Sequence, residues 1–251
     1  MIYPLVSIIM PCYNAGAYIA QAIESVLSQT YANWELLICD DCSTDNSSAI
    51  IRQYVDADAR IRYFKTQKPS GSPVMPRNIA IKEANGDVIA FLDSDDVWLP
   101  TKLERQIPLL CNEDTAIVFS NYEKINMQGV RENRVVKAPS FTNYNNLLKG
   151  CVIGNLTGIY DVSKVGKIYC ERVHHEDYLL WLTILKKGYV ARNTNTLEAL
   201  YRVCSNSVSA NKLKTIGWQW NILYNIERLP LFRAIYCFLN YAVKGFVKSL
   251  K

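Results

Sequence analysis

Carboxylates gather at two points in the sequence where an apolar run ends. Asp93, Asp95 and Asp96 follow one such run, and Asp40 and Asp41 follow another. If both runs are parallel strands of one sheet, their carboxyl ends meet at the edge where open α/β folds bind ligands. Helix capping explains one aspartate in a loop but not three in four residues, and clustered carboxylates repel one another unless a cation or a ligand's donors intervene. The pattern predicts a site for Mg²⁺ or Mn²⁺ held together with substrate phosphates.

Several common catalytic and binding motifs are absent from the sequence. No glycine-rich phosphate loop or dinucleotide fingerprint follows the first apolar run, and no G-x-S-x-G turn occurs. His174 and His175 are the only histidines, too few for a histidine-rich zinc site. Cys39 and Cys42 form a C-x-x-C pair, but the two aspartates between them oppose thiolate formation. These observations argue against zinc, redox and serine-hydrolase chemistry.

Charge is unevenly distributed along the chain. The 251 residues have a formal net charge of +5, yet residues 211–251 alone hold seven Lys or Arg and one Glu. The rest of the chain is therefore close to neutral, which argues against a nucleic-acid enzyme with a basic groove. A basic tail favours an anionic membrane surface or an acidic partner. No stretch resembles a spanning helix or a signal peptide, so we expect a cytoplasmic protein with reduced cysteines.

Apolar runs alternate with helical patterns over the first part of the chain. The expected strands cover 6–10, 35–39, 61–64, 88–92 and 116–122. The expected helices cover 18–27, a segment to residue 54 that Thr44 or Asp45 caps, 77–84, and a segment after Pro100. This alternation predicts an α/β, doubly wound, mostly parallel sheet with flanking helices. After residue 123 the pattern weakens, apart from helices at 176–187 and from Pro230 onward.

The terminal helix is amphipathic. Its apolar face holds Leu231, Ile235, Phe238, Leu239, Ala242 and Phe246, and its polar face holds Arg233, Asn240, Lys244, Lys248 and Lys251. These basic residues make it unfavourable for the helix to span a membrane. Two interpretations stay open: an interfacial helix on an anionic leaflet, peripheral on the inner face of the cell membrane, or a helix packed on the body with its lysines outside.

Six blocks of the sequence together resemble family-2 glycosyltransferases of the GT-A fold. The blocks are 6–14, 25–31, 34–45, 77–78, 86–96 and 176–181. The resemblance implies a GT-A catalytic domain over 1–210, followed by a basic helical extension over 211–251. It implies an inverting, metal-dependent transfer of a hexose or an N-acetylhexosamine from a UDP-sugar to a glycan or a polyprenyl-diphosphate-linked acceptor. The alternative is a nucleotide-sugar or carbohydrate-binding module that keeps the fold without turnover.

The resemblance assigns the nucleoside to residues near the first two strands. Pro11, Tyr13, Asn14 and Asp41 would line its pocket. Tyr13 would stack on uracil, and Asp41 would accept a hydrogen bond from the uracil N3–H. Arg77 would lie near the ribose or the diphosphate.

The resemblance also divides the acidic cluster by role. Asp93 would contact hydroxyls of the ribose or the sugar, Asp95 would coordinate Mn²⁺ or Mg²⁺ against the diphosphate, and Asp96 would lie close by. A divalent ion that bridges both phosphates neutralises the charge that develops on the leaving group.

The start of the predicted helix at 176–187 carries the remaining assignment. The resemblance makes Asp177 the general base, with Glu176 as its neighbour, because an acceptor hydroxyl needs a carboxylate within hydrogen-bond reach. Negative charge that merely stabilises a helix N-terminus is the structural alternative. One departure from the family pattern is Cys204, where relatives often carry a histidine near the metal. In this chain the role of that histidine is absent, filled by Cys204, or taken by Arg202 or Ser207.

Overall fold

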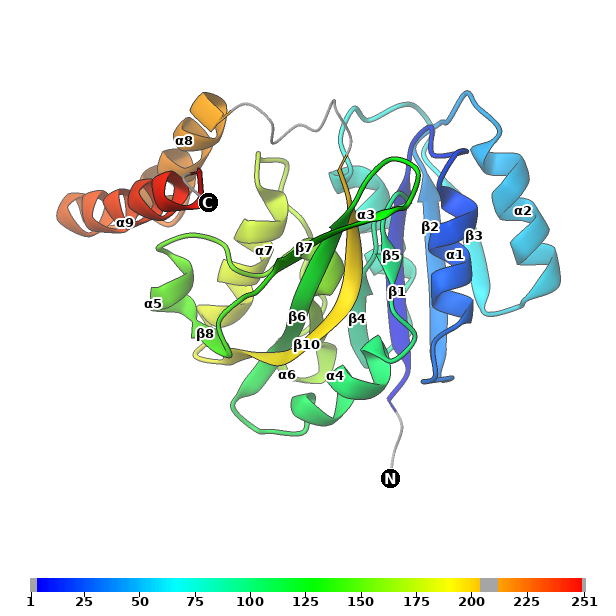
Figure 1. Ribbon diagram of the computed structural model, residues 1–251, viewed down its shortest axis with the longest axis horizontal. Coiled ribbons are helices and arrows are strands. Elements are labelled where there is room, and N and C mark those ends of the chain that lie inside the picture. Colours follow the sequence, from blue (N-terminus) through cyan, green and yellow to red (C-terminus); the bar gives the residue numbers. More distant parts are fainter. Residues whose placement is uncertain (1–3, 204–211, 250–251) are drawn as a thin grey trace.

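The computed structural model describes residues 4–203 and 212–249, and the strands within these ranges join into one ten-stranded sheet (Figure 1). They are β1 (Val6–Cys12), β2 (Trp34–Asp40), β3 (Ile61–Lys65), β4 (Val88–Phe91), β5 (Val97–Trp98), β6 (Thr115–Ile125), β7 (Arg131–Val136), β8 (Phe141–Asn143), β9 (Ile159–Asp161) and β10 (Val190–Arg202). Their order is β3-β2-β1-β4-β9-β6-β10-β5, with β7 beside β6 and β8 beside β10. The strands β1 to β4 are parallel, whereas β9 runs antiparallel between β4 and β6.

Helices cover both faces of this sheet. They are α1 (Ile19–Leu27), α2 (Ser47–Ala57), α3 (Val74–Glu83), α4 (Lys102–Leu110), α5 (Tyr144–Leu147), α6 (Val162–Val165), α7 (Glu176–Leu185), α8 (Lys212–Trp220) and α9 (Leu231–Ser249), with a π-helical segment, η3, at Asn221–Ile226. The helices α1, α2 and α4 pack on one face, and α3, α5, α6 and α7 pack on the other. Successive strand residues alternate between the two cores, so Ile8 lies in the first and Ile9 in the second. This double burial explains why β1 is apolar apart from the buried Ser7.

The GT-A-like α/β fold expected from the sequence is confirmed. All five expected strands and the helices between them are present, with small changes at their ends. The prediction of the residue that caps α2 was wrong, however, because the N-cap is Asn46 and not Thr44 or Asp45. Asp45 still contributes to this turn, since its carboxylate accepts a hydrogen bond from the Ser47 N–H at 3.0 Å.

The long strand β10 is, with β5, β7, β8 and β9, among the strands that the sequence pattern does not predict. Its register against β6 shifts between Asn193 and Leu197, and Asn195 has a positive φ of 60°. A bulge of this kind interrupts the alternation of apolar and polar residues, and asparagine is uncommon in strands. The alternation of apolar and polar residues that predicts a strand is therefore interrupted at the centre of this 13-residue strand.

The C-terminal extension packs against α7 and leaves part of α9 uncovered. The Gln219 side chain donates to the Tyr178 hydroxyl at 3.1 Å, and Lys186 pairs with Glu227 at 2.8 Å. On α9, Ala234 and Cys237 are buried, whereas a set of large apolar residues is exposed: Leu231, Phe232, Ile235, Tyr236, Leu239 and Val243. We call this set the α9 stripe. The side chains of Phe246, Lys248 and Lys251 lie outside the described residues. None of the described helices is both long and apolar enough to cross a membrane.

Candidate active site

In the part of the chain that the structure describes, two adjoining cavities open at the carboxyl edge of β1, β2 and β4. The β1 cavity, of about 580 Å³, is lined by the ends of β1 and β2 and by the acidic loop after β4. The α7 cavity, of about 760 Å³, lies against the start of α7 and the C-terminal extension. They share a wall formed by Gly71, Ser72, Pro73, Arg77, Asp93, Asp96 and Tyr201. A ligand in one cavity can therefore meet a ligand in the other.

The β1 cavity gathers most of the residues expected to bind the nucleotide sugar. Its lining includes Pro11, Tyr13, Asp41, Arg77, Asp93, Asp95 and Asp96. Tyr13 is 57% exposed, so its ring is open to a ligand. Asn14 does not line this cavity. Its side-chain oxygen accepts a hydrogen bond from the Thr44 N–H at 2.8 Å, and its φ is 48°, so Asn14 shapes the turn after β1.

Asp41 holds the loop between β3 and α3 beside the β1 cavity. Its buried carboxylate accepts hydrogen bonds from the Thr66 hydroxyl at 2.9 Å and from the Ser70 hydroxyl at 2.9 Å. It also accepts one from the Ser70 N–H at 3.0 Å. This contact joins residues 29 positions apart, which is why no local sequence pattern indicates it.

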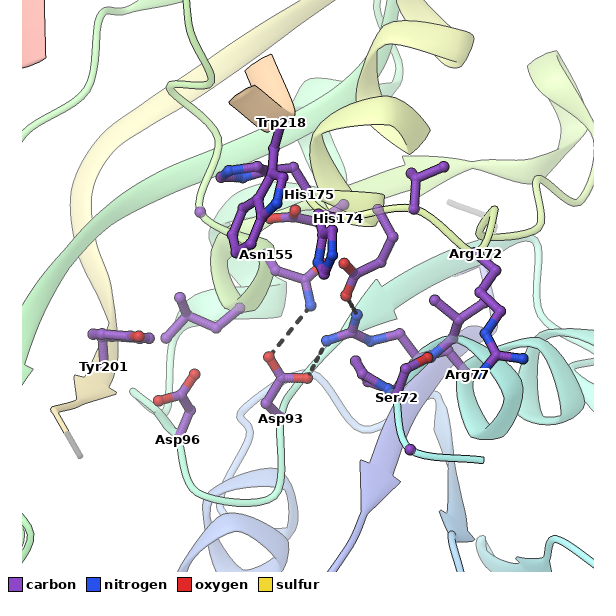
Figure 2. A pocket seen from close by; sticks show the side chains of 18 of the residues that line it. Ser72, Arg77, Asp93, Asp96, Asn155, Arg172, His174, His175, Tyr201 and Trp218 are labelled. Atoms are coloured by element: carbon purple, nitrogen blue, oxygen red, sulfur yellow. Dashed lines mark hydrogen bonds and ion pairs between the residues drawn. The ribbon is translucent and has the colours of Figure 1, made fainter. Parts of the chain in front are cut away.

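Arg77 connects the acidic loop after β4 with the start of α7. Its guanidinium lies 2.6 Å from a carboxylate oxygen of Asp93 and 2.6 Å from one of Glu176 (Figure 2). The Arg77 side chain is only 6% exposed. A guanidinium can donate in two directions at once, so a single buried cation fixes two carboxylates that come from different elements.

The acidic loop concentrates negative charge where little water reaches it. Burial raises the pKa of Asp95, and repulsion from Asp93 adds to this effect. Burial and the same kind of repulsion raise the pKa of Asp96 well above its ordinary value. Both carboxyl groups are therefore ionised less readily than in water, and a cation close to them would favour the charged form.

Arg202, at the end of β10, fixes the backbone of this loop. The side-chain Nε of Arg202 donates to the Asp95 carbonyl at 2.7 Å, and the backbone N–H of Arg202 donates to the Asp96 carboxylate at 2.8 Å. Its Nη2 donates to the Gln21 side chain at 2.6 Å. The buried Arg202 thus lines the β1 cavity while it supports the loop. Cys204 and Ser207, the other two residues considered for the departure from the family pattern, lie outside the described residues.

The donor set around the acidic loop fits a divalent ion that arrives with additional ligands. Among residues 4–203 and 212–249, no group of three His, Cys, Asp or Glu side chains is placed to hold a metal ion. Mg²⁺ is commonly bound by one or two carboxylates together with substrate phosphates and water, and not by a complete protein cage. Asp95 lines the β1 cavity beside Asp93 and Asp96, so a phosphate-bound cation would find oxygen ligands there.

The start of α7 presents its two acidic residues differently. Both Glu176 and Asp177 line the α7 cavity, but Glu176 is paired with Arg77. Burial, with a contribution from the charge of Glu176, raises the pKa of Asp177 to about 6. A carboxylate with such a pKa is ionised at neutral pH and is a better proton acceptor than an ordinary aspartate.

Sequence reasoning missed part of the α7 cavity. His174 stacks on Trp218 of α8, with ring centroids 4.1 Å apart and an interplanar angle of 14° (Figure 2). Asn155 lines the same cavity and donates to Asp93 at 3.5 Å. In the sequence analysis the two histidines served only to exclude zinc. Their position directly before Glu176 could have indicated that they line the same cavity. Nothing in the sequence around Trp218 indicates that it reaches this cavity.

A mostly parallel sheet with an acidic loop at its carboxyl edge is the architecture of GT-A glycosyltransferases. The chain belongs to the family described as glycosyl transferase family 2, whose model matches residues 7–165. The protein is accordingly a glycosyltransferase, as the sequence led us to expect.

Two relatives from Escherichia coli match nearly the whole chain. One is named UDP-Glc:alpha-D-GlcNAc-diphosphoundecaprenol beta-1,3-glucosyltransferase WfgD and is 44% identical over 97% of this chain and 94% of its own length. The other, WfaP, carries the same enzyme name and is 43% identical over 97% of this chain and 95% of its own. The crystal structure of S. aureus TarS 1–349 in complex with UDP-GlcNAc has the same fold, with a TM-score of 0.72 at 20% identity, over 96% of this chain and 72% of that chain.

Replacing Arg77 should destabilise the protein strongly. Arg77→Met leaves Asp93 and Glu176 without their cation, and breaking a buried ion pair from one side costs about 3–5 kcal/mol. Arg77→Lys should recover part of the loss, because one ammonium group does not reproduce the two-way contact. The measurement is chemical denaturation at pH 7.

The matched control for Arg77 is an exposed arginine. Arg192 pairs with Asp114 at 2.8 Å where both side chains are largely exposed, and such pairs contribute about 0–1 kcal/mol. Equal losses of unfolding free energy in Arg77→Met and Arg192→Met would contradict the role assigned to Arg77.

Proposed function

We propose that the protein transfers a hexose or an N-acetylhexosamine from a UDP-sugar to a sugar carried on polyprenyl diphosphate, with inversion at the anomeric carbon. The observation that carries this proposal is the wall shared by the two cavities, where Arg77 and Asp93 face both. Such a wall suits a reaction between two bound molecules. The names of WfgD and WfaP, which specify UDP-glucose and a diphosphoundecaprenol-linked acceptor, support this choice of substrates.

In this proposal the β1 cavity holds the donor. Tyr13 stacks on the uracil ring, and Asp41 accepts from the uracil N3–H while it keeps its contacts to Ser70. Asp93 and Asp96 lie at the wall where the donor sugar meets the α7 cavity. Asp95 would hold Mn²⁺ or Mg²⁺, and the bound ion would supply positive charge against the diphosphate. Pro11 and Arg77 complete the pocket, and Asn14 supports it from the neighbouring turn.

The acceptor occupies the α7 cavity, with Asp177 as the general base. The acceptor hydroxyl loses its proton to Asp177 as its oxygen attacks the anomeric carbon, and the bond to the diphosphate breaks on the opposite face. Glu176 is less suited to this task because Arg77 already neutralises it. The raised pKa of Asp177, about 6, supports this division of roles.

We also propose that residues 1–210 form the catalytic domain and that residues 211–251 form an extension that meets a membrane. A polyprenyl-diphosphate acceptor resides in a bilayer, so its enzyme works at the bilayer surface. On this basis we place the reaction at the inner face of the cell membrane, where the cytoplasmic donor is available.

Turnover should depend on a divalent ion and on Asp95. Purified protein with a UDP-sugar and a synthetic lipid-diphosphate N-acetylhexosamine should release UDP with Mn²⁺ or Mg²⁺ and lose this activity in excess EDTA. Asp95→Ala should abolish release, whereas Asp56→Ala, a change on the exposed side of α2, should not. Because residues 4–203 and 212–249 offer no complete metal cage, calorimetry should detect Mn²⁺ binding only when UDP is present. Full activity of the wild type in EDTA would refute the metal assignment.

Asp177→Asn should lower turnover by about 10² to 10⁴, which is the usual effect of losing a positioned acid–base group. Donor affinity should be unchanged, since the loss is confined to the chemical step. Glu176→Gln should do less damage. Single-turnover kinetics at saturating donor compare the two variants. An active Asp177→Asn beside an inactive Glu176→Gln would transfer the role of base to Glu176.

The pH profile supplies a second readout for the same assignment. Because the base must be ionised, wild-type kcat/KM should fall as the pH drops through about 6, the pKa of Asp177. Glu176 contributes to raising this pKa. The acidic limb of Glu176→Gln should therefore move to lower pH, and an unmoved limb would argue against Asp177.

The α9 stripe is the surface that we propose contacts the bilayer. Phe232 is 86% exposed, and the large apolar residues of the stripe are more extensive than the scattered ones normal for a surface. Arg228, Arg233 and Lys244 are exposed on or next to the same helix. Apolar residues flanked by basic ones complement an anionic leaflet in both polarity and charge.

The change Phe232→Ser with Leu239→Ser should abolish sedimentation with vesicles that contain phosphatidylglycerol. Added salt should weaken binding of the unchanged protein. The control is Val130→Ser with Phe141→Ser, which removes two exposed apolar residues from the sheet side and should leave vesicle binding intact. If the protein ignores vesicles and forms a dimer that the stripe variant abolishes, the stripe binds a second copy and the membrane proposal is wrong.

A further inference from the structure

We propose that Trp218 and His174 form an aromatic wall that binds the pyranose ring of the acceptor. This proposal rests on the proposed function, because it assigns the acceptor to the α7 cavity. It adds a binding residue from the C-terminal extension to a site otherwise built by the sheet and its loops.

The lining of the α7 cavity combines aromatic and polar side chains. Trp218, His174 and His175 supply aromatic rings, and Asp93, Asn155 and Glu176 supply carboxylate and amide groups. A pyranose has a rim of hydroxyl groups and a face of C–H bonds. Its hydroxyls can bond to the carboxylates and the amide while its C–H face packs on an aromatic ring. The cavity thus offers both surfaces that a hexose requires.

Several contacts hold the aromatic wall in place. His174 stacks on the indole at 4.1 Å, and His175 meets it edge-on with ring centroids 5.3 Å apart. The next residue of α8, Gln219, is buried and donates to the Tyr178 hydroxyl at 3.1 Å. Trp218 is therefore anchored to the helix that begins with Glu176 and Asp177. A ring bound on this wall would be held at a fixed position relative to Asp177.

His175 supplies an independent observation. It has a positive φ of 61°, which is uncommon for a residue with a side chain. Its Nε2 is buried and makes no hydrogen bond within the described residues. Strained backbone and unpaired buried polar atoms are concentrated at binding and catalytic sites. Both features occur in the residue between the aromatic wall and the acidic pair.

Substitution of Trp218 tests this proposal. In Trp218→Ala, the KM for a synthetic N-acetylglucosaminyl diphosphate with a short alkyl chain should rise about 10-fold. The affinity for UDP should not change, because Trp218 does not line the β1 cavity. Trp218→Phe should restore part of the acceptor affinity because it keeps an aromatic face.

Trp220 provides the matched control in the same helix. It packs on Tyr224 and Phe238 and does not line the α7 cavity. Trp220→Phe should leave the acceptor KM unchanged. An unchanged acceptor KM in Trp218→Ala, or an equal rise in Trp220→Phe, would overturn the proposal.

A binding measurement separates this proposal from the proposed function. Saturation-transfer NMR on the UDP-loaded protein should detect octyl N-acetylglucosaminide with the unchanged chain and lose it with Trp218→Ala. Loss of binding in the variant supports the aromatic wall even if the wild type transfers no sugar, in which case the proposed reaction alone is wrong. Equal binding by both proteins contradicts the wall even if transfer is observed.

Discussion

The contact of Arg77 with two carboxylates holds the candidate site together. One buried guanidinium neutralises Asp93, which follows β4, and Glu176, which begins α7. Without this cation, at least four carboxyl groups would surround a space with little water, and repulsion would separate the loop from the helix. The same contact leaves Asp177 without a cation of its own. Arg77 thus pairs with Glu176 and not with the adjacent Asp177, so the two acidic residues differ in how readily they can accept a proton.

Three further contacts support this arrangement from outside. Asp41 anchors the loop between β3 and α3, and Arg202 anchors the backbone of the acidic loop. Gln219 anchors the C-terminal extension to α7. Each contact joins segments that are far apart in the sequence. The rigid sheet supplies the positions, and these polar side chains fix the loops that carry the chemistry.

The strands and helices before residue 123 could be predicted because the residue pattern of each element agrees with its place in the fold. Buried parallel strands are mostly apolar, as β1 and β2 are, and each is followed by a helix with a clear period. The aspartates at the ends of β2 and β4 could be predicted to converge for the same reason. The strand β10 could not, because a bulge around Asn195 removes its alternation. Trp218 could not be placed in the site, since only tertiary packing brings α8 to His174.

The position of Arg202 has a thermodynamic consequence. This residue ends β10 and grips the Asp95 carbonyl, so the last strand before the extension is tied to the acidic loop. If a nucleotide shifts this loop, it shifts the end of β10 by the same linkage. Coupling free energies are reciprocal. If a bound ligand at the loop changes the affinity of the extension for its partner, the partner changes the affinity of the loop for its ligand by the same factor.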